Sequence, residues 1–161
     1  SLWCARPENH AALATLLAQP AYVGRDVELL LPALNGKLPV GGETVRTIGD
    51  FFVPNAKAAT FPWKSHALWF YTQMVRWRQI GHTAERQRLA AETYRPDIYR
   101  AALKDLGIAM PSASAKVEGA LTVATPVGSS GVLTLGPDGF FDGGRFDPDD
   151  VEAYIASQTV G

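Results

Sequence analysis

The segment 61–66 (FPWKSH) brings a lysine, a hydroxyl group, an imidazole and flat aromatic rings together at one point of the chain. A strongly apolar segment follows, so Lys64 stands immediately before the first turn of an expected helix. Free N–H groups and the positive dipole end at a helix N-terminus favour an anion. The segment therefore predicts a small anion site made by Lys64, Ser65 and Trp63, in which aromatic walls exclude water and strengthen the attraction.

An ordinary surface lysine beside a capped helix would produce the same residues, and this alternative stays open on spacing alone. Ser65 and His66 are neighbours on the expected helix and point in different directions, so they do not form a nucleophile and base. Nothing fixes the geometry of Cys4 and His10, and a lone cysteine is commonly a small apolar filler. We therefore expect no catalytic residue.

Other segments that suggest ion binding have simpler explanations. Asp138 and Asp142 are four residues apart, which does not fit the alternate acidic positions of a calcium loop, so turn and cap roles are expected. Segment 127–131 (VGSSG) lacks the Gly-Lys-Ser/Thr ending of a phosphate loop and is expected to be a connector. The single cysteine, Cys4, rules out an internal disulfide and a zinc site of paired thiolates. Neither a metal nor a cofactor is expected.

Composition limits the class of protein. The 161 residues, 47% hydrophobic and 19% charged, suffice for one sizeable core, so a single globular body over 1–161 is expected. A formal net charge of -1 provides no field for a polyanion, and nucleic acid is not expected as a partner. The longest apolar run, 67–71, is far shorter than the roughly 20 residues of a membrane span.

Helices are the elements expected to position the lysine segment. A helical hairpin is expected first, and periodic apolar residues with capping signals predict helices over 8–18, 26–34, 65–80, 83–93 and 96–106, with a last one opened by 147–150 and continuing to Ser157. Helix 65–80 has Ser65 as its expected N-cap and apolar groups nearly all round, which predicts burial on several sides. Segment 36–62 is expected to be a loop with one strand at most, and 132–135 to be a second short strand.

The lysine segment also resembles a known family. Residues 61–70, followed by 73–77, look like the aromatic-Pro-aromatic-Lys-Ser-His helix start of the nitrate-binding proteins of bacterial ABC transporters. Segments 3–9, 19–22 and 96–99 are similar to the same proteins in the same order. The resemblance spans nearly the whole chain and implies an α/β fold. By that resemblance, the chain is the helix-rich C-terminal portion of a bilobed type II periplasmic-binding protein, with few short strands.

The resemblance also implies a function. In that family the lysine that matches Lys64 contacts nitrate, whereas bicarbonate-binding relatives are thought to carry an acidic residue there that recruits calcium. The family therefore implies a non-enzymatic, periplasmic solute-binding component that holds nitrate or nitrite without a cofactor and presents it to ABC permease membrane subunits. Its other anion contacts would lie upstream of Ser1, in an N-terminal lobe that this sequence does not contain.

Two alternatives to this function remain. One is a cytoplasmic nitrate sensor of the same fold, which releases a regulatory partner protein when the anion binds. The other, an unrelated helical enzyme, needs a catalytic pair that the sequence does not offer. Because the sequence starts at Ser1 without a methionine, we expect a processed product or a fragment that has lost any targeting segment. With half of the cleft missing, weak anion binding and self-association through exposed apolar surface are expected.

Overall fold

The structure, a computed structural model, describes residues 1–128 and 133–158. Contacts divide the chain into two compact units, Ser1–Thr60 and Phe61–Gly161, and each unit is described by itself. That residues 1–161 form a single C-terminal portion of a bilobed protein remains a prediction. No helix of the described ranges is long and apolar enough to cross a membrane.

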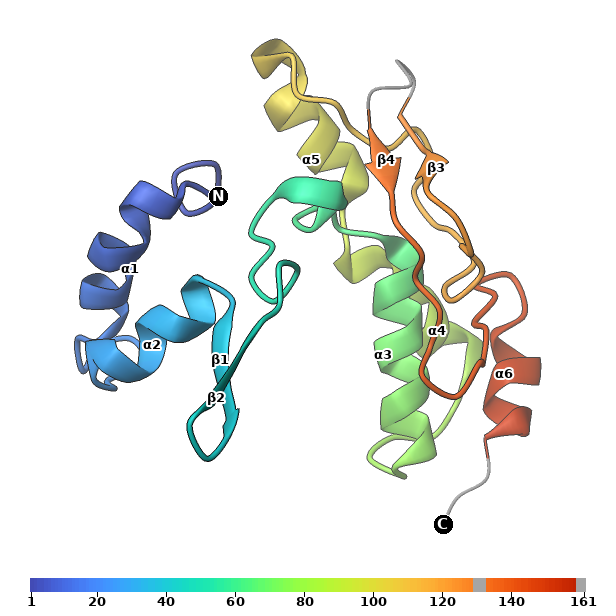
Figure 1. Ribbon diagram of the computed structural model, residues 1–161. Helices are drawn as coiled ribbons and strands as arrows, with labels where there is room; N and C mark the ends of the chain where they lie inside the picture. The colour runs from blue at the N-terminus through green and yellow to red at the C-terminus, as the bar shows by residue number, and fades with distance from the viewer. Residues whose placement is uncertain (129–132, 159–161) are drawn as a thin grey trace. The chain divides into compact units, whose positions relative to one another are not determined.

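The first unit begins with the predicted helical hairpin (Figure 1). A 3-10 turn, Pro7–Asn9, leads into α1 (His10–Leu17), and α2 spans Val27–Leu34. The small core of this unit consists of Leu13, Ala14 and Leu34, with Cys4 and Phe52 among the partly buried residues that pack against it. The two helices therefore cover each other's apolar sides, as the sequence predicted.

A strand hairpin follows, of which the sequence predicted one strand at most. Strands β1 (Lys37–Gly41) and β2 (Thr44–Thr47) are antiparallel, with Lys37 opposite Thr47. The sequence did not predict β1 because Pro39 and Gly41 interrupt its pattern, and the register shifts between these two residues. Gly42, which follows the strand, has a φ of 53°. A 3-10 turn, Ala56–Ala58, lies further along the unit.

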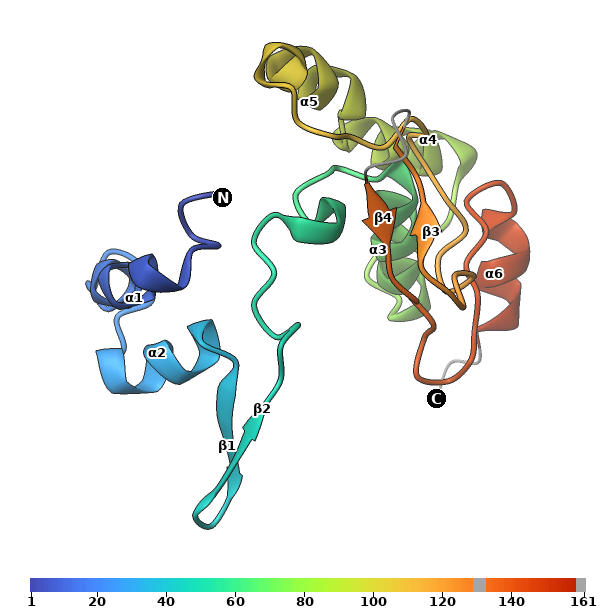
Figure 2. The ribbon, with the colours of Figure 1, turned by 45° about the horizontal axis from the view of Figure 1, so that its top comes forward.

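Three helices pack together in the second unit. The helix α3 (Lys64–Arg76) contacts α4 (Ala84–Thr93) and α6 (Val151–Ser157), and all three lie side by side in Figures 1 and 2. One cluster of buried core residues in this unit consists of Leu68, Tyr71, Phe146 and Val151. The core thus joins α3 to the C-terminal part of the described chain.

The helix α3 differs from its prediction at both ends and on one face. Trp63, not Ser65, is the N-cap, and Ser65 lies inside the first turn because its hydroxyl group bonds to a distant carboxylate described below. The helix ends at Arg76, since Arg78 takes the left-handed conformation with a φ of 58°. The prediction of burial on several sides is wrong for one face, where Phe70, Met74 and Trp77 are exposed.

The other helices of the unit follow local signals. Thr83 caps α4 by accepting a hydrogen bond from the Arg86 amide at 3.1 Å. The helix α5 (Pro96–Leu103) continues as a 3-10 turn, Lys104–Leu106, and Gly107 stops it with a φ of 62°. The last helix, α6, begins after its cap Asp150, so residues 147–149 of the predicted helix lie outside it.

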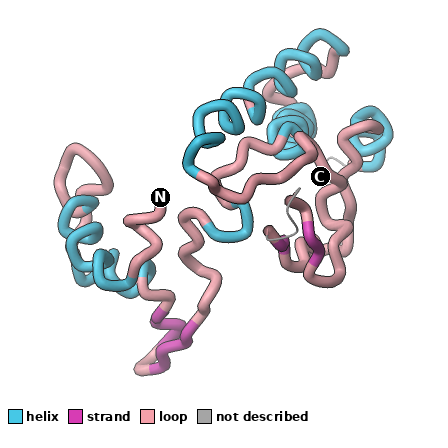
Figure 3. Tube along the Cα trace, turned by 90° about the horizontal axis from the view of Figure 1, so that it is seen from above, coloured by secondary structure: helices cyan, strands magenta, loops and turns pink. Residues whose placement is uncertain are grey.

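Strands are short in this unit as well, which Figure 3 shows from above. Strand β3 (Thr125–Pro126) pairs antiparallel with β4 (Thr134–Leu135), and Thr125 lies opposite Leu135. The sequence predicted β4 within 132–135 but missed β3. Val132 and the connector residues 129–131 lie outside the described residues. The expectation of few short strands is confirmed.

Candidate functional site

The first turn of α3 leaves two donors without an acceptor in the described chain. The Lys64 amide donates to the Ser114 carbonyl oxygen at 2.9 Å, and the His66 amide donates to the Trp63 carbonyl oxygen at 3.0 Å. Within residues 1–128 and 133–158 no acceptor faces the Ser65 amide, and no partner binds the ammonium group of half-buried Lys64. A positive charge and a helix N–H group therefore stand at the same helix start.

Trp63 supports this helix start from the core. Its side chain is 3% exposed, and its ring meets the ring of Phe61 edge-on, with 4.8 Å between centroids. The Lys116 Nζ lies 5.9 Å from the centroid of the Trp63 ring, and the Arg100 guanidinium carbon lies 5.0 Å from that of Phe61. The two rings form an aromatic base against which cations of the same unit rest.

Ser65 directs its side chain away from a ligand. Its fully buried Oγ donates to Glu118 Oε1 at 2.6 Å and accepts from the Lys116 amide at 3.3 Å. The His66 Nε2 lies 3.4 Å from the same Glu118 oxygen. Ser65 and His66 therefore meet one carboxylate instead of each other, and this arrangement does not activate the hydroxyl group as a nucleophile.

These contacts belong to a larger group that we call the polar cluster, made by Ser65, His66, Lys116, Glu118 and Asp138. The Lys116 Nζ contacts both Glu118 Oε2 and Asp138 Oδ2. The other oxygen of Asp138, Oδ1, accepts from the Leu121 amide at 2.8 Å. Two carboxylates thus share one ammonium group, and the cluster carries one negative charge in excess when His66 is neutral.

The carboxyl group of Glu118 is held in its ionised form. Burial by itself would raise its pKa, but the hydrogen bonds from His66, Lys116 and Ser65 outweigh the burial and hold the pKa below its ordinary value of 4.5. A buried carboxylate with several donors is the arrangement that favours the charged form. Glu118 is therefore a fixed negative charge beside the first turn of α3.

Backbone pairing fixes the position of Glu118. Glu118 and Phe146 exchange two backbone hydrogen bonds, each 2.9 Å long. The next residue, Gly119, has a φ of 80°, and a Cβ atom built there would lie 2.7 Å from the Gly144 carbonyl oxygen. A glycine at 119 is required for both reasons.

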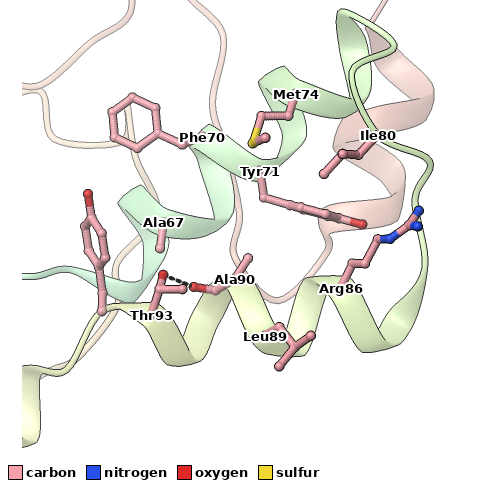
Figure 4. A pocket seen from close by; sticks show the side chains of 10 residues that line it. Ala67, Phe70, Tyr71, Met74, Ile80, Arg86, Leu89, Ala90 and Thr93 are labelled. Atoms are coloured by element: carbon pink, nitrogen blue, oxygen red, sulfur yellow. Dashed lines mark hydrogen bonds between the residues drawn. The ribbon is translucent and has the colours of Figure 1, made fainter.

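Three of the cavities in the second unit are lined by residues of α3, and two of these include Phe70. A groove of about 440 Å³ separates parts of α3 and α4, and Figure 4 shows Phe70, Tyr71 and Met74 of α3 lining it. A second cavity, of about 230 Å³, is lined by His66, Trp69, Phe70, Glu118 and Phe140. Neither is lined by Lys64, Ser65 or Trp63, so the donors of the helix start lie outside both.

Sequence reasoning missed most of the polar cluster. It considered Asp138 only for a calcium loop, and it gave no role to Lys116 or Glu118. The signal was absent because Ser65 and Glu118 are 53 positions apart and no local spacing joins them. Within the described ranges no group of three His, Cys, Asp or Glu residues could hold a metal ion.

Cys4 and His10, which the sequence offered as a thiol and an imidazole, lie in the first unit. Cys4 packs partly buried against the core around Leu13, in the filler role expected of it. The His10 Nδ1 lies 2.8 Å from Asn35 Oδ1, and the ring meets Phe52 edge-on. His10 therefore has structural neighbours, and its hydrogen bond goes to an amide side chain.

The fold defines the class of protein. It resembles the crystal structure of the periplasmic nitrate-binding protein NrtA from Synechocystis PCC 6803, with a TM-score of 0.70 and 22% sequence identity. The match covers 99% of this chain and 38% of that one. The expected α/β fold, that of part of a periplasmic binding protein, is thereby confirmed.

Sequence comparisons identify relatives that bind small anions. The chain is 31% identical to the nitrate/nitrite binding protein NrtA of Synechococcus elongatus over 155 residues, which are 96% of the chain and 31% of that protein. It is 29% identical to the bicarbonate-binding protein CmpA of the same organism, over 98% of the chain and 34% of CmpA. No family model matches. The resemblance is confirmed: the chain is a relative of the nitrate- and bicarbonate-binding solute-binding proteins, and it spans about a third of their length.

Proposed function

We propose that this chain is part of a non-enzymatic solute-binding protein that holds nitrate or nitrite and presents the anion to ABC permease membrane subunits. One observation carries the proposal: Lys64 is the first residue of α3, and its ammonium group has no partner in the described chain. Relatives over nearly the whole chain are named for binding nitrate, nitrite or bicarbonate. The proposed role needs no cofactor.

The proposed anion site consists of Lys64, Ser65 and Trp63, each in a different role. Lys64 supplies the charge, and the fully buried Ser65 fixes the first turn of α3 through its bond to Glu118. The buried Trp63 keeps the helix start on its aromatic base and away from water. A charge-assisted hydrogen bond from the lysine is a strong contact for an oxyanion.

Nitrate fits these donors better than bicarbonate does. The ammonium group of Lys64 only donates hydrogen bonds, and nitrate only accepts them. Bicarbonate carries a hydroxyl group that needs an acceptor as well. The nearest backbone acceptor, the Ser114 carbonyl oxygen, is already bonded to the Lys64 amide. The site is therefore proposed for a flat anion without a proton of its own.

The test reverses the charge at Lys64 in the complete gene product that carries this chain. Lys64→Glu should weaken nitrate binding at least about tenfold in calorimetry, because repulsion replaces a charged contact. Lys104→Glu, the same change at an exposed lysine of the second unit, is the matched control and should bind nitrate normally. Undiminished affinity in a folded Lys64→Glu variant removes Lys64 from the site.

We propose a periplasmic location, because the structurally similar NrtA is a periplasmic protein. Cell fractionation tests the placement, because the complete gene product should be released with the periplasmic contents. Recovery with the cytoplasm, together with nitrate-dependent binding to a second protein, would support the sensor instead.

A further inference from the structure

The cavity of about 230 Å³ beside α3, which we call the aromatic cavity, is lined by the rings of Trp69, Phe70 and Phe140, together with His66 and Glu118. The Trp69 and Phe70 rings meet edge-on with centroids 5.3 Å apart, and Trp69 and Phe140 are tilted with centroids 5.9 Å apart. The Trp69 Nε1 donates to the Tyr154 hydroxyl group at 3.1 Å, so the indole is held in place. Aromatic rings attract cations through their electron-rich faces.

A fixed negative charge completes this lining. Glu118, the only carboxylate among the residues that line the cavity, is buried, and the lining contains no lysine or arginine. Behind it, Lys116 neutralises only one of the two carboxylates that it contacts, Glu118 and Asp138. In a partly desolvated site, that excess of negative charge favours a cation and opposes an anion.

The oxygens of Glu118 decide which kind of cation fits. Oε1 already accepts from Ser65 and lies 3.4 Å from His66 Nε2, and Oε2 contacts Lys116. A primary amine brings three N–H donors, but Glu118 has few lone-pair sites left for them, whereas a quaternary ammonium group has no N–H to satisfy. It needs only negative charge and apolar or aromatic contact, and the cavity offers both.

We propose that the aromatic cavity binds a small quaternary ammonium ion. None of Lys64, Ser65 and Trp63 of the proposed anion site lines this cavity, although Ser65 bonds to its Glu118. The two sites also select ligands of opposite charge. The protein would therefore bind an organic cation, whereas its relatives are named for binding anions.

Calorimetry of the full chain with choline tests the proposal. Its neutral isostere, 3,3-dimethylbutan-1-ol, has the same shape without the charge, and sodium chloride keeps the ionic strength constant. We expect saturable choline binding, with the alcohol about tenfold weaker or more. Equal binding of both would show a purely apolar pocket, and the absence of saturable choline binding would overturn the site.

Variants connect the binding to the cavity. Phe140→Leu removes a ring but keeps apolar volume, and Asp138→Asn removes the unneutralised charge but keeps an acceptor for the Leu121 amide. Each should weaken choline binding about threefold to tenfold. Asp142→Asn makes the same charge change on the same segment, outside the cavity lining, and should leave binding unchanged. Unaltered binding in folded Phe140→Leu, or equal losses in both Asn variants, contradicts the proposal.

Discussion

At the residue scale, neighbouring positions at the start of α3 serve different purposes. The Lys64 ammonium group has no partner in the described chain, whereas the Ser65 hydroxyl group is fully buried against Glu118. The sequence placed both residues in one anion site. The structure supports a division in which the side chain of Lys64 is available to a ligand, whereas Ser65 is fully buried and fixes the start of the helix.

Glu118 should be the residue of the polar cluster that matters most for stability. Glu118→Gln removes the charge that holds Lys116, Ser65 and His66 together, and we expect a loss of about 1–3 kcal/mol in the free energy of unfolding. Urea unfolding followed by circular dichroism measures the loss. Glu92→Gln, at an exposed ion pair with Arg88, is the matched control and should cost about 0.5 kcal/mol or less. Equal losses in the two variants would contradict a special role for Glu118.

The same carboxylate predicts the acid sensitivity of the fold. Because the pKa of Glu118 is lower in the folded protein than its ordinary 4.5, the ionised group stabilises the fold above that pH. The contribution is lost as the pH falls below 4.5 through the folded-state pKa. Urea midpoints measured against pH should therefore fall more steeply in this range for the natural chain than for Glu118→Gln. Parallel curves would exclude Glu118 as a source of the acid sensitivity.

At the scale of elements, local signals predicted the helices but missed two of the strands, β1 and β3. Thr83 marks the start of α4 and Pro96 the start of α5, because a cap and a helix-starting proline act within a few residues. Strand β1 contains Pro39 and ends at Gly41, and β3 is only two residues long, so neither shows alternation. The Glu118 pairing with Phe146 and with Ser65 depends on contacts between distant parts of the chain, and no spacing reveals those.

The cap of α4 gives a prediction at this scale. Thr83→Ala removes the acceptor for the Arg86 amide and should reduce the free energy of unfolding by about 1 kcal/mol, whereas Thr83→Ser should keep most of it. Chemical denaturation measures both changes. Thr93→Ala, at the other end of the same helix, removes only an exposed bond to the Ala90 carbonyl oxygen and should have a smaller effect. A larger loss at 93 than at 83 would contradict the capping argument.

At the scale of the whole molecule, family resemblance predicted more than composition did. Composition indicated one sizeable core, while the contacts form two units with separate buried clusters around Leu13 and around Leu68. The α/β class followed from the resemblance of segment 61–77 and its companions, and the structural match confirmed it. Helical periodicity alone could not indicate that class, because the strands are too short to leave a pattern.

Exposed apolar side chains predict self-association of the chain. Phe141 is fully exposed, Trp77 is 64% exposed and Phe70 is 54% exposed. Side chains of this size in water favour contact between copies. Sedimentation should show a mass that rises with protein concentration, and the double variant Trp77→Gln, Phe141→Ser should reduce that rise. A monomer at every concentration tested would contradict the prediction.

Gly119 limits how this protein can vary. Any side chain there would meet the Gly144 carbonyl oxygen, and the backbone already has a φ that other residues rarely adopt. In a library with every amino acid at 118 and at 119, selection for folded protein should admit some replacements of the glutamate and almost none of the glycine. Gly119 would then be the more constrained residue of the two, because it sets the backbone path that positions Glu118.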